Sequence, residues 1–273
     1  LQVQLMCCAV ARAKAQQNPH DSNEVSALAE SLATKLQERW KRYATGAHTP
    51  ACYRLADQDF DGAREAYQRA AQIIRNPVFI AGEAMTIYQS GTNDEIVELT
   101  KSLDSVWDRA RVALTLTETD EGRQLIREIR AEILDAPTDS LDLQFLAAHL
   151  SLSLGEIETA QSQARTVVEP GAIKDSDFRT WQEWSTAVTS YIAGYISATK
   201  LENLAGEQVS WRCHALLTIA RMQLAEGDTS GALETLQRAV EIPLPWIFHF
   251  QHADGLRKRL LVLRTSGEPT PAP

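Results

Sequence analysis

The chain has 273 residues, of which 44% are hydrophobic and 23% are charged, and its formal net charge at pH 7 is -9. This composition is ordinary for a folded globular protein that is long enough to bury a large core. The acidic balance opposes general binding to phosphate backbones, which requires clustered Lys and Arg. No apolar run reaches the roughly 18 residues that a membrane helix needs. We therefore expect neither a nucleic-acid partner nor membrane insertion.

The cysteines match no zinc-binding spacing: they are Cys7, Cys8, Cys52 and Cys213. Cys7 and Cys8 are adjacent, which is too close for an ordinary disulfide. Scattered cysteines of this kind predict free thiols in a reducing compartment, hence the cytoplasm. The chain begins at Leu1 and not at Met, and we interpret it as a piece of a longer protein or as a processed one.

Helix-forming residues with apolar positions three and four apart predict an all-α fold, with one ambiguous stretch at 111–117. Residues 1–44 are predicted to form an N-terminal helix pair, Leu1–Ala15 and Val25–Tyr43, in which Asp21 or Ser22 caps the second helix. An apolar stripe on that second helix is predicted to pack into the core: Val25, Leu28, Leu32, Leu36 and Trp40.

A unit of about 33 residues then recurs over 45–264, and it reads as two helices with a tight turn. In the clearest unit the turn is Gly227-Asp228. The first helix carries Leu216, Ile219 and Ala220, the second carries Ala232, Leu236 and Ala239, and Pro243 and Pro245 end it. Alanine lets helix axes approach, glycine tolerates left-handed dihedrals, and proline lacks a donor N–H. This pattern resembles the tetratricopeptide repeat. The resemblance implies an alpha-alpha superhelix, that is, a solenoid of antiparallel helix pairs.

Four further units fit the same register less closely. The first has Ala51, the turn Asp59-Phe60, Ala63, Tyr67, Ala70 and Pro77, and we expect Pro50 to truncate its first helix. The second has Ala84, Gly91, Ile96 and Leu103, and the third has Ala113, Leu125, Ile129 and Pro137. The fourth has Ala148, the turn Gly155-Glu156, Ala160, Ala164, Val167 and Pro170. The segment 175–211 departs from the register, and we expect one long helix over Asp177–Ser197 with a short one before Trp211.

That long helix would carry an aromatic stripe on one face: Trp181, Trp184, Val188, Tyr191 and Tyr195. Two interpretations stay open. The stripe either packs against neighbouring pairs or forms a partly exposed groove wall, because Trp and Tyr are favoured anchors at interfaces.

Catalytic signatures are nearly absent, since the sequence has no P-loop, dinucleotide fingerprint, nucleophile elbow or metalloprotease helix. The best metal candidate is His249 with His252 and Asp254, but Phe248 and Phe250 interleave the histidines and no second ligand pair stands out. Asp57, Asp59 and Asp61 suit turns and N-caps better than a calcium loop. We expect no catalytic residue, no metal and no cofactor.

The resemblance also implies which residues would contact a partner, because first helices line the concave face of such arrays. In register these are Asp142, Phe145, His149 and Leu152 in one unit, and His214, Leu217, Arg221 and Leu224 in the last. Trp181 and Trp184 are added as aromatic anchors. The Lys- and Asn-rich clamp by which some family members hold a terminal carboxylate is missing. A mixed groove, with His149 and Arg221 as polar contacts, is expected instead.

The main functional hypothesis is therefore a scaffold or adaptor module that binds a protein or peptide on the concave face of the array. The first alternative is an accessory or regulatory region of a larger signalling protein or enzyme, for example one that follows a kinase domain; residues 265–273 read as a Pro-rich tail or linker. The second is an all-helical enzyme with a site inside the stack.

The basic residues of the last helix are expected on its solvent-exposed face: Arg257, Lys258, Arg259 and Arg264.

Overall fold

The computed structural model describes residues 2, 5, 6, 22–40, 42–90, 93–116, 119–136, 140–173, 180–242 and 247–266. These residues form fourteen helices and no strand, which confirms the predicted all-α class. The helices are α2 (Ser22–Arg39), α3 (Ala44–Ala56), α4 (Phe60–Ile73), α5 (Pro77–Ser90), α6 (Asn93–Lys101), α7 (Val106–Ala113), α8 (Asp120–Asp135), α9 (Leu141–Ser153), α10 (Ile157–Val167), α11 (Trp181–Ile192), α12 (Ala198–Ala205), α13 (Val209–Ala225), α14 (Thr229–Val240) and α15 (Phe248–Ser266). Within the described part of the chain, no helix is both long and apolar enough to cross a membrane.

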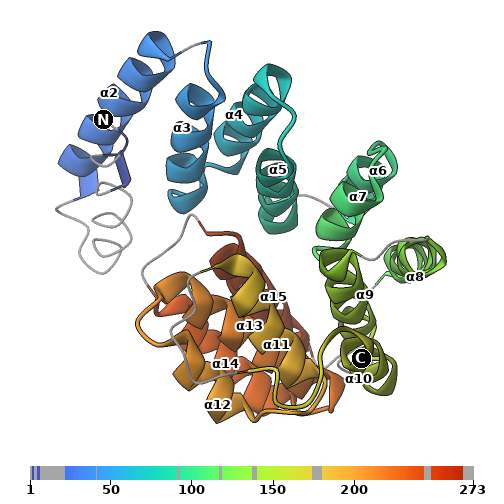
Figure 1. Ribbon diagram of the computed structural model, residues 1–273. Helices are drawn as coiled ribbons and strands as arrows, with labels where there is room; N and C mark the ends of the chain where they lie inside the picture. The colour runs from blue at the N-terminus through green and yellow to red at the C-terminus, as the bar shows by residue number, and fades with distance from the viewer. Residues whose placement is uncertain are drawn as a thin grey trace.

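The helices are arranged as an arc and a group packed against it. Helices α2 to α10 follow one another around the arc, and α11 to α15 lie together on its concave side (Figure 1). Helix α15 returns to α5, and α13 packs against α9, so segments far apart in the sequence meet in the middle of the molecule.

One turn geometry closes four of the helix pairs, α3–α4, α9–α10, α11–α12 and α13–α14. The turn contains a residue with positive φ, which is Gln58 at 64°, Gly155 at 75°, Gly194 at 80° and Gly227 at 83°. The N–H of the following residue returns to a carbonyl near the end of the first helix, at 2.8 to 3.0 Å. Glycine adopts this conformation at least cost, which explains three of the four positions. The predicted turns at 155–156 and 227–228 are confirmed, and the turn before Phe60 is built the same way without glycine.

The N-terminal unit differs from its prediction at several positions. Helix α2 ends at Arg39 and not at Tyr43, and of the predicted stripe only Leu32 and Leu36 are buried, whereas Leu28 is 56% exposed and Trp40 is 41% exposed. The buried face is centred instead on Ala29, Leu32, Ala33 and Leu36, a spacing of three and four residues. The predicted helix over 1–15 and the tail over 267–273 lie outside the described residues.

Two helix boundaries also need correction. Pro50 does not truncate its helix: it lies inside α3, which continues to Ala56, at the cost of one backbone donor. The long helix predicted to reach Ser197 ends at Ile192, because Gly194 has φ 80° and the N–H of Tyr195 returns to the carbonyl of Ser190 at 2.9 Å. The segment that broke the register thus contains another helix pair, α11 and α12.

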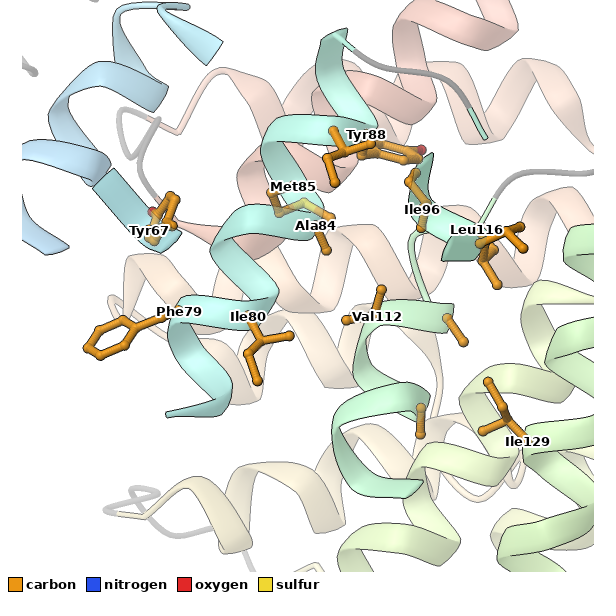
Figure 2. Packing of buried hydrophobic residues seen from close by; sticks show 14 of the residues in the cluster. Tyr67, Phe79, Ile80, Ala84, Met85, Tyr88, Ile96, Val112, Leu116 and Ile129 are labelled. Carbon is orange, nitrogen blue, oxygen red and sulfur yellow. The ribbon is translucent and has the colours of Figure 1, made fainter. Parts of the chain in front are cut away.

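The largest core cluster surrounds α5. Its side chains Ile80, Met85 and Tyr88 lie between Tyr67 on α4 and the side chains of α6, α7 and α8, among them Ile96, Val112 and Ile129 (Figure 2). Because α5 is covered on both sides along the arc and by α15, it is the helix around which the two parts of the molecule are joined.

Contacts between α15 and α5 connect two segments that lie far apart in the chain. Arg259 donates from Nη2 to the carbonyl of Tyr88 at 2.9 Å, and its guanidinium carbon lies 3.8 Å from the centre of the Tyr88 ring. Gln89 donates from Nε2 to the carbonyl of Gln251 at 2.7 Å. The sequence predicted that the basic residues of this helix face solvent. Lys258 is exposed as predicted, whereas Arg259 is partly buried against Tyr88.

Candidate functional site

A cavity of about 180 Å³ lies where the arc and the C-terminal group meet. Eight helices contribute to its wall: α3, α4, α5, α7, α9, α11, α13 and α15. The wall is largely apolar, with Leu55, Met85, Phe145, Leu146, Leu217 and Phe248 among its residues. Its nitrogen-bearing side chains are Arg111, Arg221, His48, His149, His214, His249 and His252, together with Trp181. No carboxylate lines it among the described residues.

Arg221 of α13 is a buried cation at this cavity, with 9% of its surface exposed. Its Nη2 donates to the carbonyl of Leu114 at 2.8 Å and lies 3.0 Å from Nε2 of His252. No carboxylate of the described residues forms an ion pair with it. Burial lowers the pKa of Arg221 to about 10, so the group stays charged at neutral pH. The cavity is consequently electropositive.

Arg111 of α7 is the second cation of the wall, and its environment differs. Burial lowers its pKa, but the charges of Asp108 and Asp142 act in the opposite direction. Its guanidinium carbon lies 5.7 Å from the centre of the Trp107 ring. Arg111 is thus balanced by nearby acids, whereas Arg221 is not.

Four histidines around Arg221 are held neutral. Burial is the main cause of their lowered pKa, which falls to about 3 for His149 and His249 and well below 6.5 for His214 and His252. The positive charge of Arg221 lowers all four further. Neutral imidazoles can each donate one hydrogen bond and accept one, so they offer polar recognition without adding charge.

Hydrogen bonds fix the tautomers of two of these histidines. Trp184 donates from Nε1 to Nδ1 of His214 at 3.1 Å, so the proton of His214 is on Nε2. Arg221 can only donate, so Nε2 of His252 accepts from it and Nδ1 of His252 carries the proton. That Nδ1 is buried and has no hydrogen-bond partner, and the same holds for Nε2 of His149.

Flat side chains form one wall of the cavity. The ring of His214 lies parallel to Trp181, with centres 5.3 Å apart, and to His249, with centres 4.0 Å apart. The interplanar angles are 9° and 10°. Trp181 is 46% exposed and Val78 of α5 is 49% exposed, so these two residues mark the mouth of the cavity.

The bond from Trp184 to His214 gives a first prediction. Replacing Trp184, which is fully buried, with Phe removes the donor, leaves Nδ1 of His214 without a partner and empties part of the indole volume. We expect the free energy of unfolding to fall by about 2–4 kcal/mol. Urea unfolding of Trp184→Phe measures this, with Trp211→Phe as the control because the Trp211 ring stacks on Trp184 but is partly exposed. Equal losses in both variants would show that the hydrogen bond contributes nothing specific.

The cavity brings together most of the residues that the sequence singled out as partner contacts. Six of the ten line it: Phe145, His149, Trp181, His214, Leu217 and Arg221. Leu152 and Leu224 instead pack in the core clusters. Trp184 lies behind the wall, bonded to His214, and Asp142 is exposed and outside the lining. Except for Trp181, the six are at most 9% exposed. They therefore surround an interior cavity and do not present an open surface.

The sequence left two interpretations of the aromatic stripe of α11 open, core packing and a partly exposed wall, and different residues of the stripe fit each of them. Trp184 and Val188 are completely buried in a core cluster, whereas Trp181 is half exposed at the mouth. Tyr195 lies beyond the end of the helix.

Sequence reasoning missed the residues that the N-terminal half contributes, chiefly His48, Cys52, Tyr67 and Arg111. His48 and Cys52 nevertheless occupy concave positions, because they precede Gln58 by 10 and 6 residues, as Phe145 and His149 precede Gly155. The expected truncation of their helix at Pro50 concealed this match. His249 and His252 both line the cavity, while Asp254 pairs with Arg257 and Lys258. Over the described ranges, no three His, Cys, Asp or Glu side chains are grouped so that they could hold a metal.

A thiol and an imidazole lie together at one side of the cavity, which bears on the enzyme alternative. Sγ of Cys52 is 3.4 Å from Nε2 of His48 and 3.6 Å from the hydroxyl of Tyr67. Burial raises the pKa of Cys52 and lowers the pKa of His48, so both groups are neutral at pH 7. A nucleophilic cysteine needs the thiolate, which this environment opposes.

Comparison with known proteins adds no assignment. No protein-family model matches the sequence, and no curated protein matches it.

Proposed function

We propose that the chain is a helical-repeat binding module, a solenoid related to tetratricopeptide arrays, that binds a segment of another protein across the mouth of the central cavity. The observation that carries the proposal is the half-exposed pair Trp181 and Val78 at that mouth. Exposed aromatic and aliphatic side chains beside a concavity are typical anchors of protein interfaces. The shared turn of four helix pairs supports the relationship to repeat arrays.

The size of the cavity limits how a partner could use it. A volume of about 180 Å³ cannot hold an extended peptide, so a partner would contact the rim with most of its residues. This differs from the open groove expected from the sequence, because α11, α13 and α15 occupy the concave side of the arc. A role as a regulatory region of a larger protein is compatible with this proposal, because such a region also acts by binding.

Replacing Trp181 with Ala tests the proposal. We expect the variant to lose at least about 10-fold in affinity for its partner, because a large aromatic side chain at an interface contributes about 2 kcal/mol or more. Partners are captured from a lysate of the source organism with the wild-type chain, identified, and titrated against both proteins. Leu134→Ala is the matched control, because Leu134 of α8 is 52% exposed and lies outside the cavity lining. Partners that bind Trp181→Ala as tightly as the wild type would contradict this site.

A further inference from the structure

The interior of the cavity contains a buried positive charge that no carboxylate of the described residues compensates. Arg221 is charged and buried, and a buried cation is costly unless an anion or several acceptors compensate it. Both of its hydrogen bonds use Nη2, so Nε and Nη1 have no partner among the described residues. Each guanidinium edge with two parallel N–H groups includes Nη2, whose two protons are already donated, so a carboxylate would accept single charge-assisted hydrogen bonds from Nε or Nη1.

The polar groups around Arg221 favour an anion of the same kind. Nδ1 of His252 is a donor without an acceptor, on a residue that lines the cavity. Nε2 of His149 is also buried without a partner and can serve as donor or acceptor. No carboxylate among the described residues lines the wall, so nothing there competes with or repels an incoming anion, and a metal cation would be repelled by Arg221 and Arg111.

The rest of the cavity wall favours an anionic group that is attached to a flat, apolar ring. The rings of Trp181, His214 and His249 stack on one another at the wall, and Phe145 and Leu217 contribute apolar surface. The volume of about 180 Å³ compares with the roughly 150 Å³ of an apolar protein cavity that binds benzene. Inorganic phosphate or sulfate would fill only part of this space and would leave the apolar side chains without a contact.

We propose that the cavity binds a small organic acid, a carboxylate on a flat ring of about benzene size, with the carboxylate on Arg221 and the ring among the apolar and aromatic side chains of Phe145, Trp181 and Leu217. The acid would lie inside the cavity, beneath the mouth to which a partner protein would bind. This inference does not depend on the proposed protein partner, since a chain that binds no protein would still bind the acid.

Calorimetric titration of the whole chain with phenylacetate tests this inference. Phenylacetamide, the neutral amide of the same shape, and inorganic phosphate are the comparison ligands. We expect saturable binding of one phenylacetate per chain and at least 30-fold weaker binding of the amide and of phosphate. Arg221→Met is expected to abolish the preference for the acid. Arg130→Met is the matched control, because Arg130 of α8 is also partly buried but pairs with Glu156, outside the cavity lining.

Leu217→Phe provides a second variant that does not depend on removing the charge. It fills the cavity while Arg221 stays in place, so it is expected to abolish phenylacetate binding in a protein that keeps its helical circular dichroism. The inference is overturned if phenylacetate, benzoate and indole-3-acetate all fail to bind the wild type at millimolar concentration. It is also overturned if the acid and its amide bind equally, or if Leu217→Phe binds the acid as the wild type does.

Discussion

Lowering the pH from 7 to 5 is expected to destabilise the folded chain by several kcal/mol. His149, His214, His249 and His252 have a folded pKa far below the value of 6.5 in an unfolded chain, because burial and Arg221 oppose their protonation. Below pH 6.5 the unfolded state therefore binds more protons than the folded state, and stability falls as the pH falls. Each such proton contributes about 1.4 kcal/mol per pH unit once the pH is well below 6.5. This loss continues toward pH 3 for His149 and His249.

Urea unfolding at half-unit steps between pH 7.5 and 4.5 measures this dependence. At pH 5 the slope of the unfolding free energy should correspond to an uptake of about four protons by these histidines, with carboxylates contributing mainly below that pH. His149→Asn removes one of the four, so its slope should be smaller by about 1.4 kcal/mol per pH unit. A stability that is constant between pH 7 and 5 would show that these imidazoles are not buried in the way described.

The second large effect is expected at Gly255 of α15. A Cβ at this position would lie 2.3 Å from Cε1 of Tyr88, so a side chain forces α15 away from α5 or displaces the tyrosine. Overpacking of this kind costs about 1–3 kcal/mol, and separation of the helices would add the lost contacts of Arg259 and Gln89. We expect Gly255→Val to be about 3 kcal/mol less stable than the wild type and to expose α15 to amide hydrogen exchange.

Leu261→Val is the control for that variant, because it places the same β-branched residue on α15 at a position that is 40% exposed. Its loss should stay below about 1 kcal/mol, which is the range of helix propensity alone. If both variants lost the same small amount of stability, Tyr88 and Gly255 would not be in close contact in solution.

The sequence predicted the helices and six of the cavity residues because both follow from local periodicity. Gly155 and Gly227 mark turns by their backbone freedom, and the register of the first helices placed His149, His214 and Arg221 on faces that converge. What the register could not predict is that those faces are covered. The return of α15 to α5 joins Arg259 to Tyr88, which are 171 positions apart, and no local signal encodes such a contact.

Other misses have equally specific causes. Gln58 adopts the positive φ that glycine usually adopts, so its residue type gave no sign of the turn. Pro50 is accommodated inside a helix, so its residue type wrongly predicted a helix end. His48 and Arg111 line the cavity from α3 and α7, two helices whose sequences match the repeat pattern poorly. The sequence alone could not predict that Arg221 lacks a carboxylate partner among the described residues. Acidic residues are plentiful in the chain, and only the structure shows which of them lie near Arg221.

The central claim is that α15 closes onto α5 and thereby encloses the cavity, and a cross-link tests it most directly. Cysteines are introduced by Gln89→Cys and Gln251→Cys, two positions joined by hydrogen bonds at 2.7 and 2.9 Å, in a chain that also carries Cys7→Ser and Cys8→Ser. The closed arrangement predicts efficient intramolecular cross-linking by a short bismaleimide, which spans the reach of two side chains, detected by mass and by mobility, and none in either single variant. Only intermolecular products, or no cross-link, would show that α15 does not lie on α5, and the cavity would then have no closed wall.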